Sequence, residues 1–397
     1  MSKFLILGAG PSGLSFANKL LKNGVDDFLV LERFGEAGGL CRSVDVDGTA
    51  FDFGGGHFLD VRRKNVLDFL FAFMPESEWN TFDRDSQICI HGKFINSPIE
   101  ANIWQMDLNQ QVEYLKAIAV AGCNLGEEMP EHFVDWIYWK LGSKVAEDYM
   151  LPYNRKMFGK DLNELGTYWL SKLPNVSFEE TLISCLEKKA YGSQPAHAKF
   201  YYPKKFGYGE IWKRMADNLG DRIIYNEKVN KIDLNTRTVN DKYSADIIVN
   251  TIPYAEFTDI EGMDSEVRAL IDTLKFSSVV TEYHPENMDT HAQWIYYPDE
   301  NLSYHRILVR HNFCSGSKGY WTETNLTRFK EDKNYPSFVN DYAYPLNTIG
   351  KNENMKTILD HLESKGVYGL GRWGEWQHYN SDVVVELAMN LADKLTN

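Results

Sequence analysis

The sequence predicts an α/β protein in which a nucleotide-binding domain, built from separated segments, is interrupted by a mainly helical insertion and an antiparallel sheet. Three observations support this prediction. A strand, a glycine-rich turn, a helix and a second strand follow one another at the start of the chain. Residues 60 to about 190 carry apolar side chains at helical spacing, and residues 275–325 alternate apolar and polar side chains.

The first element is a strand at Phe4–Leu7, followed at once by the turn Gly8–Gly13 and a helix. A second buried strand, Phe28–Leu31, ends at Glu32. This is the G-x-G-x-x-G dinucleotide fingerprint of a Rossmann-like domain, in its required context. The first glycine makes the turn, the second admits a pyrophosphate to the helix N-terminus, and the third lets the helix pack on the strand, while the acid binds ribose hydroxyls. The expected cofactor contacts here are Gly8, Gly10, Pro11, Ser12, Gly13 and Glu32.

A second glycine motif follows the acid. Glu32-Arg33 precedes Gly38-Gly39-Leu40-Cys41-Arg42, which resembles the second signature of flavin enzymes in the amine oxidase superfamily. The glycines let the backbone pass close to a cofactor, and Arg42 can bind phosphate. A surface turn is the plain alternative, because glycines also favour turns. The expected cofactor contacts in this motif are Arg33, Gly39, Leu40 and Arg42.

The run Asp52-Phe53-Gly54-Gly55-Gly56-His57 contains too many glycines for a regular strand. We expect its backbone to pack against something flat, such as a flavin ring, with Gly55, Gly56 and His57 facing the cofactor. A structural role for His57 fits the sequence equally well.

A further match to the fingerprint, Gly369–Gly374, lies near the C-terminus. It lacks a following strand that ends in an acid, and the next expected helix, about Asp382–Leu395, starts eight residues late. We therefore expect no second nucleotide fold, and hence no dedicated domain for a nicotinamide cofactor.

The remaining elements follow from their apolar spacing. The expected helices are Asn65–Met74, Asp107–Cys123, Pro130–Leu141, Ser143–Met150 and Glu210–Asn218. The expected strands are a hairpin at Ser86–Ile90 and Lys93–Ile95, then Phe200–Pro203, Arg222–Tyr225, Lys228–Asp233, Thr236–Val239 and Ala245–Thr251. The predicted domains are the nucleotide-binding domain at 1–60, 205–265 and 350–397, the helical insertion at 61–195 and the antiparallel sheet domain at 266–349.

Composition excludes several classes of protein. The chain has 397 residues with a net charge of −14, which argues against a general nucleic-acid binder but not against a local cationic pocket. Its five cysteines include no C-x-x-C pair, which indicates reduced thiols and argues against structural zinc. The longest apolar run, Ala117–Cys123, is far shorter than a membrane span, and Phe4–Leu7 is no secretory signal. We expect a cytoplasmic protein.

Read together, the motifs resemble the flavin-dependent UDP-galactopyranose mutases, especially their eukaryotic-type branch. The resemblance spans nearly the whole chain, and the later motifs point to the mutases most directly. Besides the glycine motifs, it covers Trp136, Pro152-Tyr153-Asn154 in a helix and the turn after it, Pro203–Trp212, Trp294-Ile295-Tyr296-Tyr297-Pro298, Tyr304-His305-Arg306, Tyr344-Pro345, Gly371-Arg372-Trp373-Gly374-Glu375-Trp376 and Asp382.

The resemblance implies non-covalent FAD that acts in the reduced state, with an external reductant such as NAD(P)H. It implies that flavin N5 attacks the anomeric carbon of a nucleotide sugar and expels the nucleoside diphosphate, so that the sugar can change between pyranose and furanose forms. This reaction is net redox-neutral, belongs to cell-surface polysaccharide biosynthesis and takes a nucleotide sugar as its partner. The resemblance leaves a homo-oligomer open.

The resemblance also implies roles for individual residues. His57 and Arg306 take the catalytic positions, and Arg306 is matched to a diphosphate-binding arginine, with a surface salt bridge as its alternative. The implied substrate contacts are Asn154, Trp294, Tyr296, Arg306, Tyr344 and Tyr379. The further implied cofactor contacts are Val229, Gly371, Arg372, Ser381 and Asp382.

The chain departs from the mutase pattern at three places. Leu151 stands where that branch has a second diphosphate arginine, and Arg155, Lys156 or Lys160 of the same segment could supply the charge instead. The stretch at 96–100 lacks the expected uridine-contact character and ends in Glu100, an acid unfavourable near a diphosphate. The C-terminal motif is also shorter. These changes put the nucleotide and the sugar in question.

Two other functions fit the same motifs. An oxidase or dehydrogenase of the amine oxidase type would act on an amine, carotenoid or porphyrin-like substrate, but Arg306 with a tyrosine cluster does not suit an apolar tunnel. A non-catalytic descendant would bind FAD without turning over any nucleotide sugar.

Overall fold

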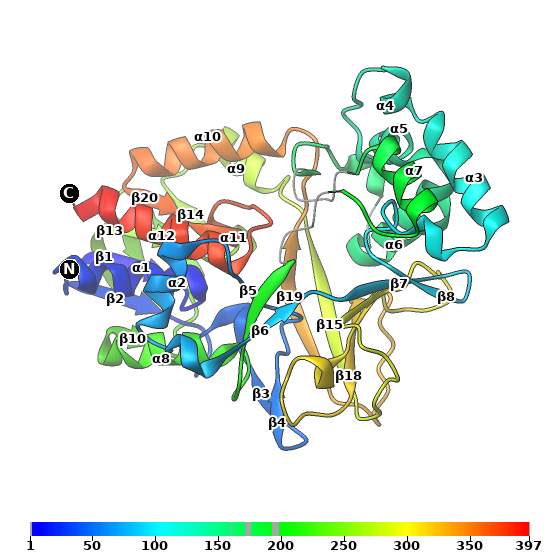
Figure 1. Cartoon of the computed structure of the whole chain (residues 1–397). Helices are drawn as coiled ribbons and strands as arrows, with labels where there is room; N and C mark the ends of the chain where they lie inside the picture. Colours follow the sequence, from blue (N-terminus) through cyan, green and yellow to red (C-terminus); the bar gives the residue numbers. More distant parts are fainter. Residues whose placement is uncertain (1, 160, 171–175, 193–197, 397) are drawn as a thin grey trace. The chain divides into compact units, whose positions relative to one another are not determined.

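The computed structural model describes residues 2–159, 161–170, 176–192 and 198–396 (Figure 1). The chain divides into two compact units. Unit 1 contains Met1–Asn80, Tyr201–Phe276 and Gly350–Asn397, and unit 2 contains Thr81–Phe200 and Ser277–Ile349. The chain passes from one unit to the other within β6 (Trp79–Asp83) and β9 (Lys199–Pro203).

Unit 1 is built on five parallel strands in the order β10-β2-β1-β13-β20. These strands are β1 (Ser2–Leu7), β2 (Phe28–Leu31), β10 (Ile223–Ile224), β13 (Tyr243–Asn250) and β20 (Val367–Gly369). From β1, the sheet extends through β2 to β10 on one side and through β13 to β20 on the other. This order places a topological switch point between β1 and β13, where doubly wound folds bind ligands beyond the carboxyl ends of the strands.

The central strand explains why this sheet forms. Phe4, Leu5, Ile6 and Leu7 are all at most 1% exposed, as expected for a parallel strand covered on both faces. Beyond β13 the sheet continues through β12 (Thr238–Val239), β11 (Lys231–Asp233) and β14 (Asp259–Glu261). The antiparallel pair β3 (Val44–Val46) and β4 (Thr49–Phe51) forms a separate hairpin, and β5 (Leu59–Asp60) follows it.

Helices cover the sheet of unit 1 (Figure 1). They are α1 (Pro11–Lys22), α2 (Lys64–Phe71), α8 (Gly209–Asp217), α9 (Ser265–Ile271), α10 (Lys351–Ser364), α11 (Gly371–Gly374) and α12 (Ser381–Thr396). Helix α1 begins with proline, whose fixed φ suits a first turn. The ion pair Lys19–Asp393, at 2.8 Å, joins α1 to the C-terminal helix α12.

Unit 2 contains a seven-stranded sheet in the order β19-β15-β18-β17-β16-β7-β8. Its strands are β7 (Ser86–Ile90), β8 (Lys93–Asn96), β15 (Phe276–His284), β16 (Trp294–Tyr296), β17 (Arg306–Leu308), β18 (Tyr320–Asn325) and β19 (Ser337–Pro345). Strands β15 to β18 pair antiparallel, while β16 and β7 pair in parallel. The predicted hairpin β7–β8 is confirmed, and it extends the sheet formed by the later strands.

The helices of unit 2 are α3 (Leu108–Ala119), α4 (Gly122–Leu125), α5 (Phe133–Val145), α6 (Leu151–Phe158) and α7 (Phe178–Glu187). Gly142 interrupts α5 with a φ of 71°, where a Cβ would lie 2.4 Å from the carbonyl oxygen of Ala117. The predicted break between two helices at this glycine is therefore confirmed. A π-helical turn at Ala146–Met150 continues directly into α6.

Some expected boundaries are wrong. Pro152-Tyr153-Asn154 lies inside α6 and not in a turn, because the helical backbone runs on from the π-helical turn Ala146–Met150 through this proline. The expected helix Asp107–Cys123 is two helices, α3 and α4. A short helix, α11, begins directly at the C-terminal glycine motif, and that motif follows β20 of the first sheet. Within the described part of the chain, no helix has the length and apolar character needed to span a bilayer.

Lys156 is a fully buried lysine of α6 whose ammonium donates hydrogen bonds to the carbonyls of Tyr297 and Asp299, at 2.8 and 2.7 Å. Burial lowers its pKa from 10.5 to about 8, and repulsion from Arg328 acts in the same direction. Its charge is thus bound to backbone carbonyls of unit 2.

We expect Lys156 to make the protein more stable as the pH rises from about 8 to 10.5, because the unfolded chain binds the lysine proton over this range and the folded chain does not. The free energy of unfolding, measured in urea across this range, should rise by roughly 1–3 kcal/mol more in the wild type than in Lys156→Met. Lys116→Met, at an exposed site on α3, is the control and should keep the wild-type slope. An identical pH slope in wild type and Lys156→Met would contradict the assignment.

Candidate functional site

The fingerprint turn lies at the switch point of the unit 1 sheet. Gly8 follows β1 with a φ of +98°, and a Cβ there would lie 2.7 Å from Oγ1 of Thr251, at the end of β13. A Cβ on Gly13 would lie 2.0 Å from the carbonyl oxygen of Gly8, so only glycine lets α1 start this close to β1. Pro11 and Ser12 form the first turn of α1, whose N-terminal amides favour an anion.

The acid at the end of β2 is fixed by this turn. Glu32 is buried, and its two carboxylate oxygens accept hydrogen bonds from the backbone N–H groups of Ala9, at 2.8 Å, and Phe34, at 2.9 Å. Burial raises the pKa of this carboxyl, and the two N–H groups oppose that rise. Each oxygen keeps a second acceptor position for a ribose hydroxyl.

The second glycine motif packs directly on the first. A Cβ on Gly39 would lie 3.1 Å from Cα of Gly10, so these two backbones touch. A Cβ on Gly54 would lie 1.7 Å from the carbonyl oxygen of Leu40, which brings the third glycine run to the same place. Three segments separated in sequence therefore meet beside the N-terminus of α1.

The two arginines of this region are held by acids and rings. Arg42 pairs with Glu36 at 3.0 Å, and its guanidinium lies over the rings of Phe34 and Phe53. Arg33 pairs with Glu256 at 2.7 Å. Burial lowers the pKa of Arg42, and the charge of Glu36 opposes this.

The C-terminal motif joins the same site. A Cβ on Gly371 would lie 2.0 Å from Oγ of Ser12. The guanidinium of Arg372 donates to the carbonyl of Tyr379, and Ser381 shares a hydrogen bond of 2.6 Å with the hydroxyl of Tyr208.

Two acids of the C-terminal segment lie near this motif. Asp382 is 2% exposed and pairs with Arg63 at 2.8 Å. Glu375 accepts the N–H of Gly371 at 2.8 Å, and burial raises the pKa of its carboxyl to about 7.

The remaining predicted cofactor contacts lie in loops of unit 1. Gly55 has a φ of +99°, Gly56 follows it, and the ring of His57 stacks on Tyr208 with ring centres 6.2 Å apart. Val229 is buried, two residues after Glu227, whose N–H donates to the carbonyl of Glu32.

These residues fit a dinucleotide cofactor. A Cβ on Gly10 would make only an ordinary contact, 3.8 Å from Cα of Gly39, in contrast to the overlaps at Gly13, Gly54 and Gly371. The packing of the protein itself therefore does not require a glycine at position 10. Close approach of a pyrophosphate to the backbone does require one. The fingerprint turn, the acid and the two contacting glycine segments would hold the cofactor.

The second group of predicted residues lies on the sheet of unit 2. Arg306 of β17 stands directly opposite Tyr296 of β16 on one side and Glu323 of β18 on the other. Its Nε donates to Glu323 at 3.0 Å, and its Nη2 donates to the same oxygen and to the hydroxyl of Tyr344, the latter at 3.4 Å. The side chain of Arg306 is 16% exposed and that of Glu323 is 1% exposed.

The charge of Arg306 is maintained despite its burial. Burial disfavours the guanidinium charge, but the combined attraction of Glu323 and the surrounding tyrosines outweighs it and holds the pKa of Arg306 well above its usual value. Tyr153 of α6 packs edge-on against Tyr296, with ring centres 5.5 Å apart. The neighbouring His305 is fully buried, and burial together with repulsion from Arg306 keeps its pKa well below 6.5, so it is neutral. The structure thus brings Arg306, Tyr296 and Tyr344 together, as the resemblance implies.

Of the other predicted substrate residues, Trp294 shares a sheet face with Tyr296, while Asn154 and Tyr379 are placed elsewhere. Trp294 lies two residues before Tyr296 on β16 and is buried. The side-chain amide of Asn154 donates to the carbonyl of Met150 in its own helix, at 2.7 Å. Tyr379 belongs to unit 1, where burial raises the pKa of its hydroxyl to about 12.

The candidates for a replacement cation near Leu151 do not gather at one place. Leu151 is buried in α6, Arg155 is exposed, and the ammonium of Lys156 is bound to two backbone carbonyls. The expectation that Lys156 supplies the charge is therefore wrong, because its donors are turned to Tyr297 and Asp299. Lys160 lies outside the described residues.

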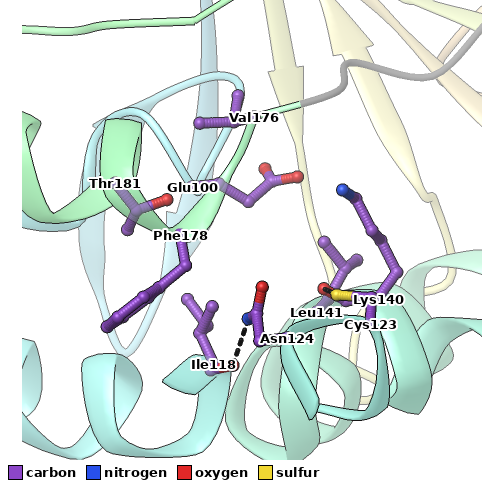
Figure 2. Close-up of a pocket in the computed structure, with 9 residues that line it drawn as sticks. All are labelled: Glu100, Ile118, Cys123, Asn124, Lys140, Leu141, Val176, Phe178 and Thr181. Atoms are coloured by element: carbon purple, nitrogen blue, oxygen red, sulfur yellow. Dashed lines mark hydrogen bonds between the residues drawn. The ribbon is translucent and has the colours of Figure 1, made fainter. Parts of the chain in front are cut away.

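Glu100 lines a separate small pocket of unit 2, with a cavity volume of about 10 Å³ (Figure 2). Figure 2 shows Glu100 and Lys140 reaching into this pocket from opposite walls. Burial raises the pKa of Glu100, and the charge of Lys140 opposes that rise. The pocket is smaller than the sites that hold drug-sized ligands, about 300–1,000 Å³.

Sequence reasoning missed Arg84 and Glu323. Arg84 stands between two aspartates, which is typical of a solvated turn, yet it donates to the hydroxyl of Tyr296 at 2.5 Å. Glu323 is the acid within Tyr320–Asn325, and a lone acid at a buried position of a central strand is the signal that could have identified it.

We expect Gly10→Ala and Gly13→Ala to separate cofactor binding from folding. Gly10→Ala should leave the unfolding free energy of the flavin-free protein within about 0.5 kcal/mol of wild type, because its Cβ would meet the protein only at the ordinary contact distance of 3.8 Å from Gly39. It should weaken dinucleotide binding at least about tenfold, because the added methyl group hinders close approach of a pyrophosphate. Gly13→Ala should destabilise the flavin-free protein itself, because its Cβ would overlap the Gly8 carbonyl. Thermal unfolding of flavin-free protein and flavin titration measure the two effects. Equal destabilisation by both substitutions would contradict this division of roles.

Comparisons with known proteins agree with this geometry. The crystal structure of reduced UDP-galactopyranose mutase has a TM-score of 0.89 with this chain, covers 100% of this chain and 94% of its own, and is 21% identical. Cyclohexylamine oxidase from Brevibacterium oxydans has a TM-score of 0.66, covers 100% of both chains and is 14% identical. At these identities the likeness shows a shared fold.

A curated relative is 48% identical over 52 residues: the uncharacterized protein in the nifH2 3' region of Methanothermococcus thermolithotrophicus. The match covers 13% of this chain and 49% of that protein, so this chain spans about half the length of the curated relative. A family model described as flavin containing amine oxidoreductase matches residues 11–282, more than half of the chain. Its members carry a flavin of the FAD type, which the glycine motifs of unit 1 fit. The chain belongs to the flavin containing amine oxidoreductase family.

Proposed function

We propose that the protein is an FAD-dependent mutase that interconverts the pyranose and furanose forms of a nucleotide-diphosphate sugar. The observation that carries this proposal is the charged Arg306 set among Tyr153, Tyr296 and Tyr344 on the sheet of unit 2. A nucleoside diphosphate is the leaving group of such a reaction, and it needs a cation with hydrogen-bond donors around it. The likeness in fold to reduced UDP-galactopyranose mutase supports the same proposal.

The reduced flavin, when bound, would supply the nucleophile for the anomeric carbon of the sugar. The chain's own task is then to hold the diphosphate. Arg306 presents a planar guanidinium that can bind phosphate oxygens in pairs, and the hydroxyl of Tyr344 is already within its reach. The hydroxyl of Tyr296, on the neighbouring strand, adds a further donor.

The buried Glu323 has two consequences for this role. It keeps Arg306 charged and fixes the position of the guanidinium through Nε and Nη2. It also leaves the remaining guanidinium N–H groups for other acceptors, since both bonds to Glu323 go to one carboxylate oxygen. A preorganised donor of this kind costs no reorganisation when charge develops on the leaving group.

The cellular setting belongs to the same proposal. We place the enzyme in the cytoplasm, with a nucleotide sugar as its partner and with NAD(P)H as the external reductant that brings FAD to its active state. In this setting the product would feed cell-surface polysaccharide biosynthesis.

A second candidate is an oxidase of the amine oxidase type. The family match and the likeness to cyclohexylamine oxidase favour it. A charged Arg306 beside a buried carboxylate speaks against it, because an apolar or cationic substrate gains nothing from a guanidinium at the site. Anaerobic mixing separates the two functions, because an oxidase's substrate reduces the flavin and a mutase's does not.

We expect turnover to require reduced flavin and to consume no reductant in proportion to product. Dithionite-reduced protein should be incubated anaerobically with a panel of nucleotide sugars, with oxidised protein as the control, and the products separated by chromatography. Isomerised sugar from the reduced protein alone is the expected result. Oxygen consumption in proportion to product would support the oxidase, and bound FAD without turnover would support the non-catalytic alternative.

We expect Arg306→Ala to lower kcat/KM at least about 100-fold, which is the scale of removing one preorganised donor. Arg306→Lys keeps the charge but loses the planar fork, so it should retain part of the activity. Steady-state kinetics with confirmed FAD content provide the measurement. Near-wild-type turnover by Arg306→Ala would show that this arginine does not bind the leaving group.

A further inference from the structure

Arg84 is a second arginine of the tyrosine cluster in unit 2. One of its Nη groups donates to the hydroxyl of Tyr296 at 2.5 Å, and its guanidinium lies 4.9 Å from the ring centre of Trp294. Tyr296 and Trp294 are two residues apart on β16, so their side chains share one face of the sheet. Arg84 therefore lies over the face that carries Arg306, which stands directly opposite Tyr296 on β17.

The backbone of this segment is fixed. The N–H of Arg84 donates to the carbonyl of Ala198 at 2.9 Å, and the N–H of Asp85 donates to the side chain of Gln293 at 2.6 Å. In return, the N–H of Gln293 donates to the carbonyl of Asp85 at 2.9 Å. Arg84 is thus presented by a chain segment bound on both sides, which is the preorganisation that a binding site requires.

The two arginines make the same kind of contact with a tyrosine. Arg84 donates to the oxygen of Tyr296, and Arg306 donates to the oxygen of Tyr344. A phenol oxygen that accepts from a guanidinium turns its own O–H hydrogen away from that guanidinium. Each pair therefore presents a cationic donor and a hydroxyl donor side by side, which is the donor set that a phosphate group binds.

Tyr296 lies between the two arginines. Its electrostatic influence reaches Arg306, Tyr149 and Tyr153, and Tyr149 is also under the influence of Arg84. The acid in the cluster, Glu323, binds Arg306 on the β18 side, away from β16. The cluster thus carries one guanidinium at each of two neighbouring positions, with a shared tyrosine between them.

We infer that Arg84 is a second anion-binding residue, and that Arg84–Tyr296 and Arg306–Tyr344 form a two-part site in which each pair binds one phosphate of a diphosphate. The inference rests on the proposed function for the identity of its natural ligand, a nucleotide-diphosphate sugar. The anion site itself is tested without turnover.

The experiment measures equilibrium binding to the FAD-loaded, full-length protein by calorimetry. The ligands are UDP, inorganic pyrophosphate and uridine, the last as the probe without phosphate. The variants are Arg84→Gln, Arg84→Lys and Tyr296→Phe. Arg328→Gln is the matched control, because Arg328 is an arginine of the same unit whose guanidinium donates to the carbonyl of Glu300 at 2.9 Å.

Arg84→Gln should weaken binding of UDP and pyrophosphate at least about tenfold, the scale of one charge-assisted hydrogen bond, and leave uridine unchanged. Arg84→Lys should recover part of the loss, because charge remains without the fork. Tyr296→Phe should weaken the same two ligands by a smaller factor, and Arg328→Gln should match the wild type. A double substitution, Arg84→Gln with Arg306→Gln, should abolish pyrophosphate binding.

Three outcomes would overturn the inference. Unchanged UDP and pyrophosphate affinity in Arg84→Gln would make Arg84 a purely structural partner of Trp294. An equal loss for uridine would indicate general damage to the unit, and no pyrophosphate binding by the wild type would remove the site. Failure of the proposed function looks different: the wild type would bind pyrophosphate through Arg84 yet isomerise no nucleotide sugar.

Discussion

Direct backbone contact between distant segments is the constraint on which unit 1 depends. At the carboxyl end of β1, Gly10 touches Gly39 and Gly54 meets the carbonyl of Leu40, while the backbone of Gly371 meets the side chain of Ser12. A single added methyl group at Gly54 or Gly371 would overlap its neighbour, so these segments can meet only where side chains are missing. The parallel sheet supplies the platform for this meeting, because its switch point lies at the carboxyl ends of β1 and β13. The same exclusion of side chains is what close approach of a dinucleotide requires.

Unit 2 depends on a different constraint, because it holds a charged guanidinium in place within a protein of net charge −14. Burying a guanidinium alone would be costly, and Glu323 offsets that cost from the adjacent strand. The tyrosines complete the environment without adding charge. The neutral, buried His305 beside them avoids a second positive charge at a position that could not be solvated.

The first part of the fold could be predicted from the sequence in detail, because the glycine fingerprint marks a turn that joins a strand to a helix in a Rossmann-like domain. Gly8, Gly13 and Glu32 each have one physical role, and that role depends on neighbours within a few residues. The joining of β7 and β8 to β16 could not be read in this way, since a hairpin's own pattern does not say which sheet edge it meets. Arg84 and Glu323 were missed for the same reason: the contacts of each are with a strand or side chain far away in the sequence. Lys156 shows the converse, because a charge in the expected segment turned out to be bound by distant carbonyls.

The cross-strand pair of Arg306 and Glu323 has an evolutionary consequence. The two positions face each other in neighbouring strands, and the carboxylate is 1% exposed. Loss of the arginine would leave a buried negative charge without a partner, and loss of the acid would leave a buried positive charge without one. Either single substitution is therefore disfavoured. Among descendants of this chain, positions 306 and 323 should therefore change together or not at all. A lineage that lost the proposed diphosphate binding would be recognisable by the paired replacement of both residues with uncharged ones.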